Sequence, residues 1–171
     1  MPTIDARTFT EPELREMLRT LANGSYSTEA AVELVISTGT WLRRGDFLRD
    51  CVTAISDGPH NRGHAPLATI NWHAAAQYAE HAPASRGETA MLRLACSLTG
   101  VPTGSLRELT VALDPTNTGR LIDAIAHGAG WHQSGNSHTT SGYQMPSAAA
   151  RQLPRAAQRG PSLSAQRPPS M

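Results

Sequence analysis

The sequence predicts an all-α protein, a compact bundle of about six helices over residues 1–129 with a disordered tail over residues 130–171. Apolar side chains recur every three to four residues up to residue 129, the spacing of one helix face. Capping residues and Gly or Pro breaks separate these stretches, and none alternates with the period of two typical of a strand. From Gly130 onward Ser, Gly, Pro, Gln and Arg dominate, so burial cannot offset the entropy of ordering the chain.

Three helices are predicted before residue 57. Thr10 and Glu13 have the spacing of a capping box, in which each residue hydrogen-bonds the backbone of the other, and they start the first helix. The second helix begins at Ser27 or Thr28 and carries an apolar stripe to Leu42, although Gly39 weakens its middle. The third begins near Asp46, taken as its cap, and extends to residue 56.

The middle of the chain is predicted as a loop followed by two helices. Residues 57–69 are rich in Gly, Pro, His and Asn, which is typical of a loop. Asn71 caps a helix that Pro83 terminates. Ser85 and Glu88 form a second capping box, and the helix behind them is apolar over so wide an arc that we expect it at the centre of the core.

Two further helices complete the predicted bundle. Ser105 caps a short helix, and Asp114-Pro115 combines a cap with the favoured first helical residue. The apolar residues of this last helix are Leu121, Ile122, Ile125, Ala126 and Ala129.

The composition indicates a cytoplasmic protein without a membrane anchor. No apolar run approaches the roughly 18 residues that cross a bilayer, and the first residues lack the pattern of a signal peptide. The two cysteines, Cys51 and Cys96, form no close pair, so we expect buried, reduced thiols in place of a disulfide framework.

Charge is distributed unevenly along the chain, although the net charge is only +1. All 14 acidic residues lie at or before Asp123, and all basic residues are arginine. The tail carries four arginines without an acidic residue: Arg151, Arg155, Arg159 and Arg167. These arginines are candidates for sequence-independent phosphate contacts, but their sparse spacing favours a solubilising or functionless tail.

No motif for catalysis, cofactor binding or metal binding stands out, so we expect no catalytic residue, cofactor or metal ligand. Residues 114–125 resemble a calcium loop in their opening Asp and sixth-position Gly, but Ile125 stands where a bidentate carboxylate is required. His60 and His64 have the spacing of one pair of zinc ligands, whereas zinc needs three or four ligands. Nucleophile and nucleotide-binding signatures are missing as well.

The best candidate for an interaction surface is the junction between the second and third predicted helices. Trp41, Arg43, Arg44 and Phe47 combine residue types that are enriched in binding hot spots. Helical periodicity favours a plainer interpretation, in which the two aromatic residues close the core and the two arginines stay in water.

These observations favour a noncatalytic helical protein that binds an unknown protein partner or forms a homo-oligomer. A first alternative is a nucleic-acid-associated accessory protein that uses a helix pair, residues 28–44 and 46–56, together with the arginine-bearing tail. The charge of −3 up to residue 130 argues against it. A second alternative is a metal-dependent enzyme built around the loop over residues 59–64.

Overall fold

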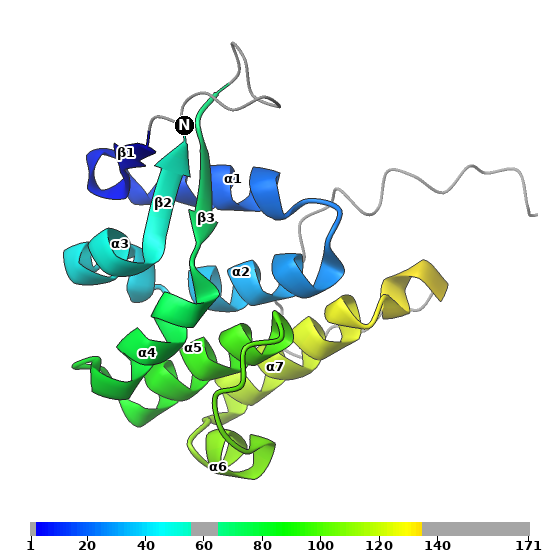
Figure 1. Ribbon diagram of the computed structural model, residues 1–171. Coiled ribbons are helices and arrows are strands. Elements are labelled where there is room, and N and C mark those ends of the chain that lie inside the picture. Colours follow the sequence, from blue (N-terminus) through cyan, green and yellow to red (C-terminus); the bar gives the residue numbers. More distant parts are fainter. Residues whose placement is uncertain (1–2, 56–64, 135–171) are drawn as a thin grey trace, which may run out of the picture.

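The computed structural model describes residues 3–55 and 65–134, apart from the side chain of Ser134. Within these residues helices predominate, so the predicted mainly helical fold is confirmed (Figure 1). The elements in chain order are β1 (Thr3–Asp5), η1 (Ala6–Thr8), α1 (Glu11–Ala22), α2 (Tyr26–Thr38), η2 (Trp41–Arg43), α3 (Gly45–Cys51), β2 (Val52–Ile55), β3 (Leu67–Ile70), α4 (Trp72–His81), α5 (Arg86–Leu98), α6 (Leu106–Val111), α7 (Pro115–Gly128) and η3 (Trp131–Ser134), where η denotes a 3₁₀ helix.

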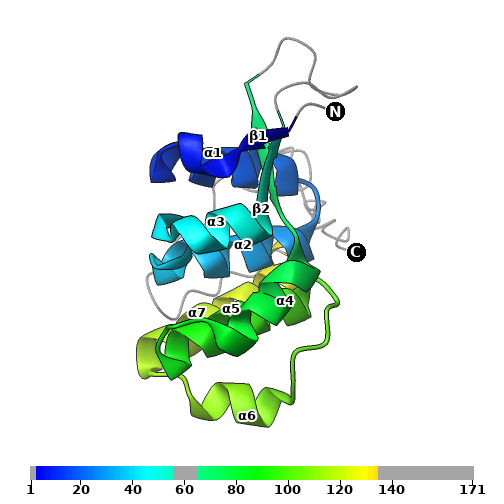
Figure 2. The same ribbon diagram turned by 60° about the vertical axis from the view of Figure 1, so that its left-hand side comes forward.

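Helix α2 lies at the centre of the fold. Seven consecutive residues, 30–36, are buried, so neighbours cover the helix on every side. It packs against α1, α5 and α7. In Figure 2, α1, then α2 with α3, and then α4, α5 and α7 follow one another from top to bottom, with α6 beneath them. Helix α5 contacts α2, α4, α6 and α7, which confirms the central position predicted from its wide apolar arc.

A small antiparallel sheet, in the order β1-β2-β3, was not predicted. Strands β2 and β3 pair from Val52 opposite Ile70 to Ile55 opposite Leu67. Burial alternates along both strands, so the sheet buries one face, which α1 covers next to β3. The expectation of no strand was wrong. Strands β2 and β3 have only four residues each, which is too few for an alternating pattern to be recognised, and β2 directly follows a helix. The segment predicted as a loop over residues 57–69 contains part of this sheet.

Two helix boundaries also differ from the prediction. The second helix ends at Thr38, and Gly39 follows it in the left-handed conformation with φ of 69°. The third helix ends at Cys51, where the backbone of Val52 turns to an extended conformation and starts β2. Asp46 lies inside the first turn of this helix, and Arg44 takes the cap position predicted for Asp46.

Helix α2 begins at Tyr26, slightly before the predicted Ser27 or Thr28, and the other predicted helix starts are confirmed. Glu13 accepts hydrogen bonds from the backbone N–H and the hydroxyl of Thr10 at 2.7 Å each. The side chains of Asn71, Ser85, Ser105 and Asp114 each accept a hydrogen bond from a backbone N–H three residues later.

The described chain continues five residues beyond the predicted boundary at residue 129. Gly130, with φ of 72°, turns the chain at the end of α7, and η3 follows. The remainder of the tail that we predicted to be disordered, from residue 135, lies outside the described residues.

Candidate interaction surface

Helix α7 packs one face against α2 and α5. Asp114 starts it by accepting the N–H of Asn117 at 2.8 Å, and Pro115 follows as the first helical residue. Near its other end, Gly128 faces α2, where a Cβ would make an ordinary van der Waals contact, 3.8 Å from the Cβ of Ala30. The buried residues of α7 are Gly119, Leu121, Asp123, Ala124 and His127.

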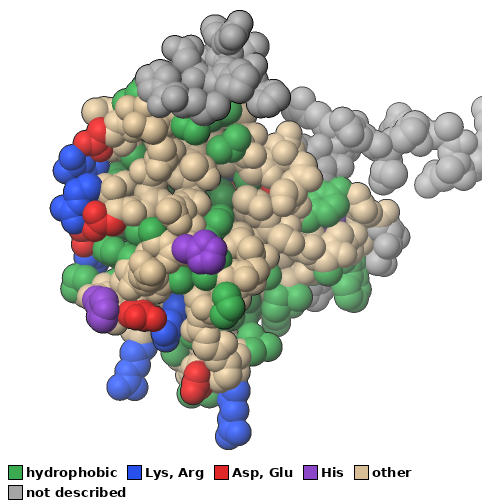
Figure 3. Space-filling model, viewed as in Figure 1, with side chains coloured by type: hydrophobic (Ala, Val, Ile, Leu, Met, Phe, Trp, Pro, Cys, Tyr) green, Lys and Arg blue, Asp and Glu red, His purple; other side chains and the backbone are tan. Residues whose placement is uncertain are grey.

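The opposite face of α7 is apolar and open to solvent. Ile122 is 42% exposed and Ile125 is 46% exposed. Thr118, Ala126 and Ala129 lie on the same side, within an arc of about 100° along about 16 Å of helix. We call these five residues the α7 outer face. Hydrophobic side chains gather at the lower right of Figure 3, where α7 runs in Figure 1.

No charged side chain belongs to the α7 outer face. Asp123 and His127 lie on the buried side of α7, and the partly buried Arg120 donates a hydrogen bond to the Asn117 amide oxygen at 3.0 Å. Charged side chains instead pair elsewhere on the described surface, as where Arg49 meets Asp50 at 2.7 Å, and they gather at the left edge of Figure 3. The α7 outer face is therefore distinct in its chemistry from the surface around α3.

The structure places the aromatic residues of the predicted interaction surface inside the core. Trp41 and Phe47 are fully buried, and their ring centroids lie 5.6 Å apart. This agrees with the plainer interpretation of the two residues. Arg43 is exposed and pairs with Glu11 at 2.7 Å. An interaction through this junction stays a prediction, and only its arginines are available for it.

Arg44 joins α3 to α4. Its guanidinium lies 6.0 Å from the centroid of the Trp41 ring and 5.9 Å from that of Tyr78. It also pairs with Asp46 at 2.8 Å and donates to the carbonyl oxygen of Pro83 at 2.8 Å. The hydrogen bonds from Arg44 and Tyr78 hold the pKa of Asp46 well below its usual range. Burial, together with the hydrogen bond to Asp46, raises the pKa of Tyr78 to about 12.

The remaining predicted features lie in the core or outside the described residues. Burial raises the pKa of Cys51 and of Cys96 to about 12, so both thiols stay protonated at neutral pH. A protonated thiol is a poor nucleophile, in line with the predicted packing role. The loop over residues 59–64 and the four tail arginines fall outside the described residues. Within residues 3–55 and 65–134, no group of three His, Cys, Asp or Glu side chains is arranged to hold a metal ion.

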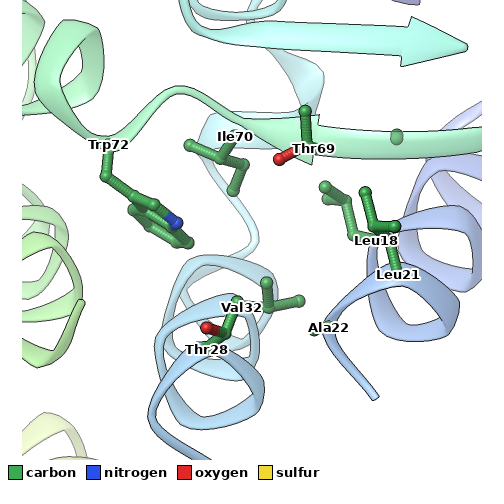
Figure 4. Close-up of a pocket in the computed structure, with 9 residues that line it drawn as sticks. Leu18, Leu21, Ala22, Thr28, Val32, Thr69, Ile70 and Trp72 are labelled. Carbon is green, nitrogen blue, oxygen red and sulfur yellow. The ribbon is translucent and has the colours of Figure 1, made fainter. Parts of the chain in front are cut away.

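A small hollow opens between α1, α2 and β3 (Figure 4). Leu18, Val32 and Ile70 converge on it, and Trp72 closes one side. Apart from the Trp72 indole nitrogen and the hydroxyls of two threonines, its lining is apolar. Its volume of about 40 Å³ is well below the roughly 300–1,000 Å³ of ligand pockets, so it lacks the room for a cofactor.

Comparison of the chain with protein-family models, with curated proteins and with solved structures finds no match. Across the part of the chain that the structure describes, no helix combines the length and the apolar character needed to span a bilayer. The candidate site therefore depends on geometry, and its clearest feature is the α7 outer face.

Proposed function

We propose that this protein acts by self-association, with the α7 outer face of one copy packed against the same face of a second copy. The observation that carries the proposal is the exposure of Ile122 and Ile125 on a helix face without charge. Apolar side chains grouped on an exposed face are typical of protein interaction sites, because burying them removes apolar area from water.

A second copy of this chain suits the face better than a charged partner does. Two identical subunits related by a twofold axis bring the same patch together from both sides. A charge within such a patch would often lie close to the same charge on the second copy, and this repulsion would cost binding free energy. The α7 outer face avoids this cost, whereas the paired arginines and acids around α3 would not.

The expected complex is weak and depends on concentration. Full burial of an isoleucine contributes about 1.5–3 kcal/mol. Since Ile122 and Ile125 are already about half buried, each contributes roughly 1 kcal/mol, and the four in a dimer about 4 kcal/mol. Association also costs translational and rotational freedom. A single substitution that replaces the favourable burial of one isoleucine by charge repulsion is therefore enough to dissociate the pair.

Sedimentation velocity of the full chain tests the proposal. We expect the mean sedimentation coefficient to rise with concentration up to about 1 mM. This is the dissociation constant for a net binding free energy of about 4 kcal/mol, when the other contacts of the interface offset the cost of association. Ile122→Arg removes apolar area and places two like charges at the contact, so this variant is expected to remain a monomer. Val111→Arg is the matched control, because Val111 is 81% exposed on α6, outside the α7 outer face.

Two results would overturn the proposal. One is a wild-type chain that stays monomeric over the whole concentration range, which would leave the face to a different partner. The other is equal dissociation of the two variants, which would place the contact elsewhere or show that it is nonspecific. Circular dichroism of both variants checks that each retains its helices.

The other two interpretations draw less support from the described residues. These residues carry 13 acidic side chains and 10 arginines, so they present an excess of negative charge to nucleic acid. They also lack the ligand cluster that a metal-dependent enzyme needs. Neither count reaches the loop over residues 59–64 or the four tail arginines.

A further inference from the structure

Four side chains gather where the start of α2 meets the end of α7. The buried ring of His127 contacts the Glu29 carboxylate, with 2.6 Å between His127 Nε2 and Glu29 Oε2. The ring of His132, from η3, stacks on His127 with centroids 4.7 Å apart and an interplanar angle of 12°. Tyr26 lies edge-on to both rings, with centroid distances of 5.6 Å to His127 and 4.8 Å to His132.

Local backbone geometry brings His132 back over His127. Gly130 adopts a left-handed conformation, and its N–H donates to the carbonyl oxygen of His127 at 2.8 Å. The N–H of Gln133 then donates to the carbonyl oxygen of Gly130 at 3.0 Å, and the side-chain amide of Gln133 donates to the Tyr26 hydroxyl. Helix η3 is thus docked through the stacked histidine rings and a contact to Tyr26.

The docked position of His132 disfavours its charged form. Both ring nitrogens of His132 are buried, and neither has a hydrogen-bond partner. An imidazolium would place two donors and a full charge in this site, which is far more costly than a neutral ring. The groups that face it are His127 from α7 and Glu29 and Tyr26 from α2. Burial and then the charge of His127 lower the pKa of His132, while Glu29 opposes the shift to a smaller extent.

We propose that η3 is an acid-released latch, which stays docked against α2 and α7 while His132 is neutral and leaves them when His132 takes up a proton. In the released state His132 is in water, where the pKa of histidine is near 6.5. Docking is therefore at full strength above pH 6.5. It weakens as the pH falls below that value, by up to about tenfold per pH unit, until the docked ring is itself protonated.

The latch uses a different side of α7 from the proposed self-association. His127 lies on the buried side of α7, away from the α7 outer face. Release also adds a positive charge at His132, close to the point where residues 135–171 begin. An acidic medium is thus the signal that would change how this end of the domain is presented to its surroundings.

An NMR titration of the full chain from pH 8 to pH 5 tests the latch at a concentration low enough to keep the protein monomeric. The readouts are the ring proton of His132 and the indole resonance of Trp131. In the wild type we expect both to move together as the pH falls below about 6.5. His132→Phe keeps a ring that stacks on His127 but takes up no proton, so η3 should stay docked at pH 5.

His73→Phe provides the matched control, because His73 is exposed on α4 and lies outside the cluster. This variant should release η3 as the wild type does. A Trp131 resonance that stays at its pH 8 position down to pH 5 would overturn the latch. So would release of η3 in His132→Phe at the same pH as in the wild type, because a different group would then control it.

Discussion

The ion pair between Arg19 and Glu33 offers a sharp test of the packing between α1 and α2. Glu33 carries a charged side chain, yet its position on the central helix α2 leaves it only 2% exposed. Arg19 approaches it with two guanidinium nitrogens, Nε next to Oε1 and Nη2 at 2.9 Å from Oε2. The arginine side chain itself is 36% exposed. We therefore consider the variant Arg19→Met, which keeps the aliphatic part of the side chain and removes the charge.

The expected loss follows from what remains after the substitution. Removing one partner of a fully buried ion pair costs about 3–5 kcal/mol, because the other charge stays buried without compensation. Water already reaches Arg19, so in Arg19→Met it can enter part of the vacated space and solvate the Glu33 carboxylate. We therefore expect a smaller loss of about 2 kcal/mol. Arg49→Met is the control, because its exposed pair with Asp50 is worth about 0–1 kcal/mol.

Urea unfolding at pH 7 measures these differences, and a double variant separates charge from packing. Replacing both partners by apolar residues, Arg19→Met with Glu33→Leu, leaves no buried charge and should return the free energy of unfolding to within about 1 kcal/mol of the wild type. The reasoning is refuted if Arg19→Met costs no more than Arg49→Met, or if the double variant is less stable than Arg19→Met alone.

Three further predictions concern buried and capping groups. Burial raises the pKa of Cys51 and of Cys96 to about 12, so both thiols should resist a thiol reagent at pH 8 in the native protein and react once it is unfolded. Rapid reaction of the native protein would contradict this. Trp41→Ala empties a fully buried site, so it should lower the free energy of unfolding in urea by about 3 kcal/mol or more, and a loss below about 1 kcal/mol would speak against it. The hydrogen bond from Thr40 lowers the pKa of Glu88, so its stabilisation is present above the ordinary glutamate pKa of about 4.3 and disappears as the pH falls through the lower folded value. Glu88→Gln should therefore cost less stability at pH 3 than at pH 7, and an equal cost at the two pH values would exclude this cause.

Most helix starts and the central position of α5 were predictable from the sequence, because local residue patterns indicate them. Ser85 with Glu88, and Asp114 with Pro115, satisfy backbone groups within a single turn, so their spacing alone indicates a helix start. The wide apolar arc behind Ser85 placed α5 in the core because only a helix surrounded by neighbours buries so much of its circumference.

The sheet and the candidate site depend on contacts between distant parts of the chain, which periodicity does not record. Strand β2 pairs with β1, which lies about 50 residues earlier in the chain. In α7, Leu121 and Ile122 belong to one apolar pattern, but Leu121 faces the core and Ile122 faces solvent. The sequence shows that both are apolar, whereas the position of α2 and α5 decides which one they cover. The stacking of His132 on His127 likewise follows from the turn at Gly130, and histidine spacing alone did not indicate it.

The central position of α2 has a consequence for the order of events during synthesis. This helix is complete once residue 38 has been translated, but its neighbours α5 and α7 end at residues 98 and 128. At about 5–20 residues per second, a ribosome needs roughly 5–18 s to deliver them. During that interval the apolar sides of α2 lack their covering helices, so the nascent chain exposes apolar surface to solvent until α5 and α7 have been made.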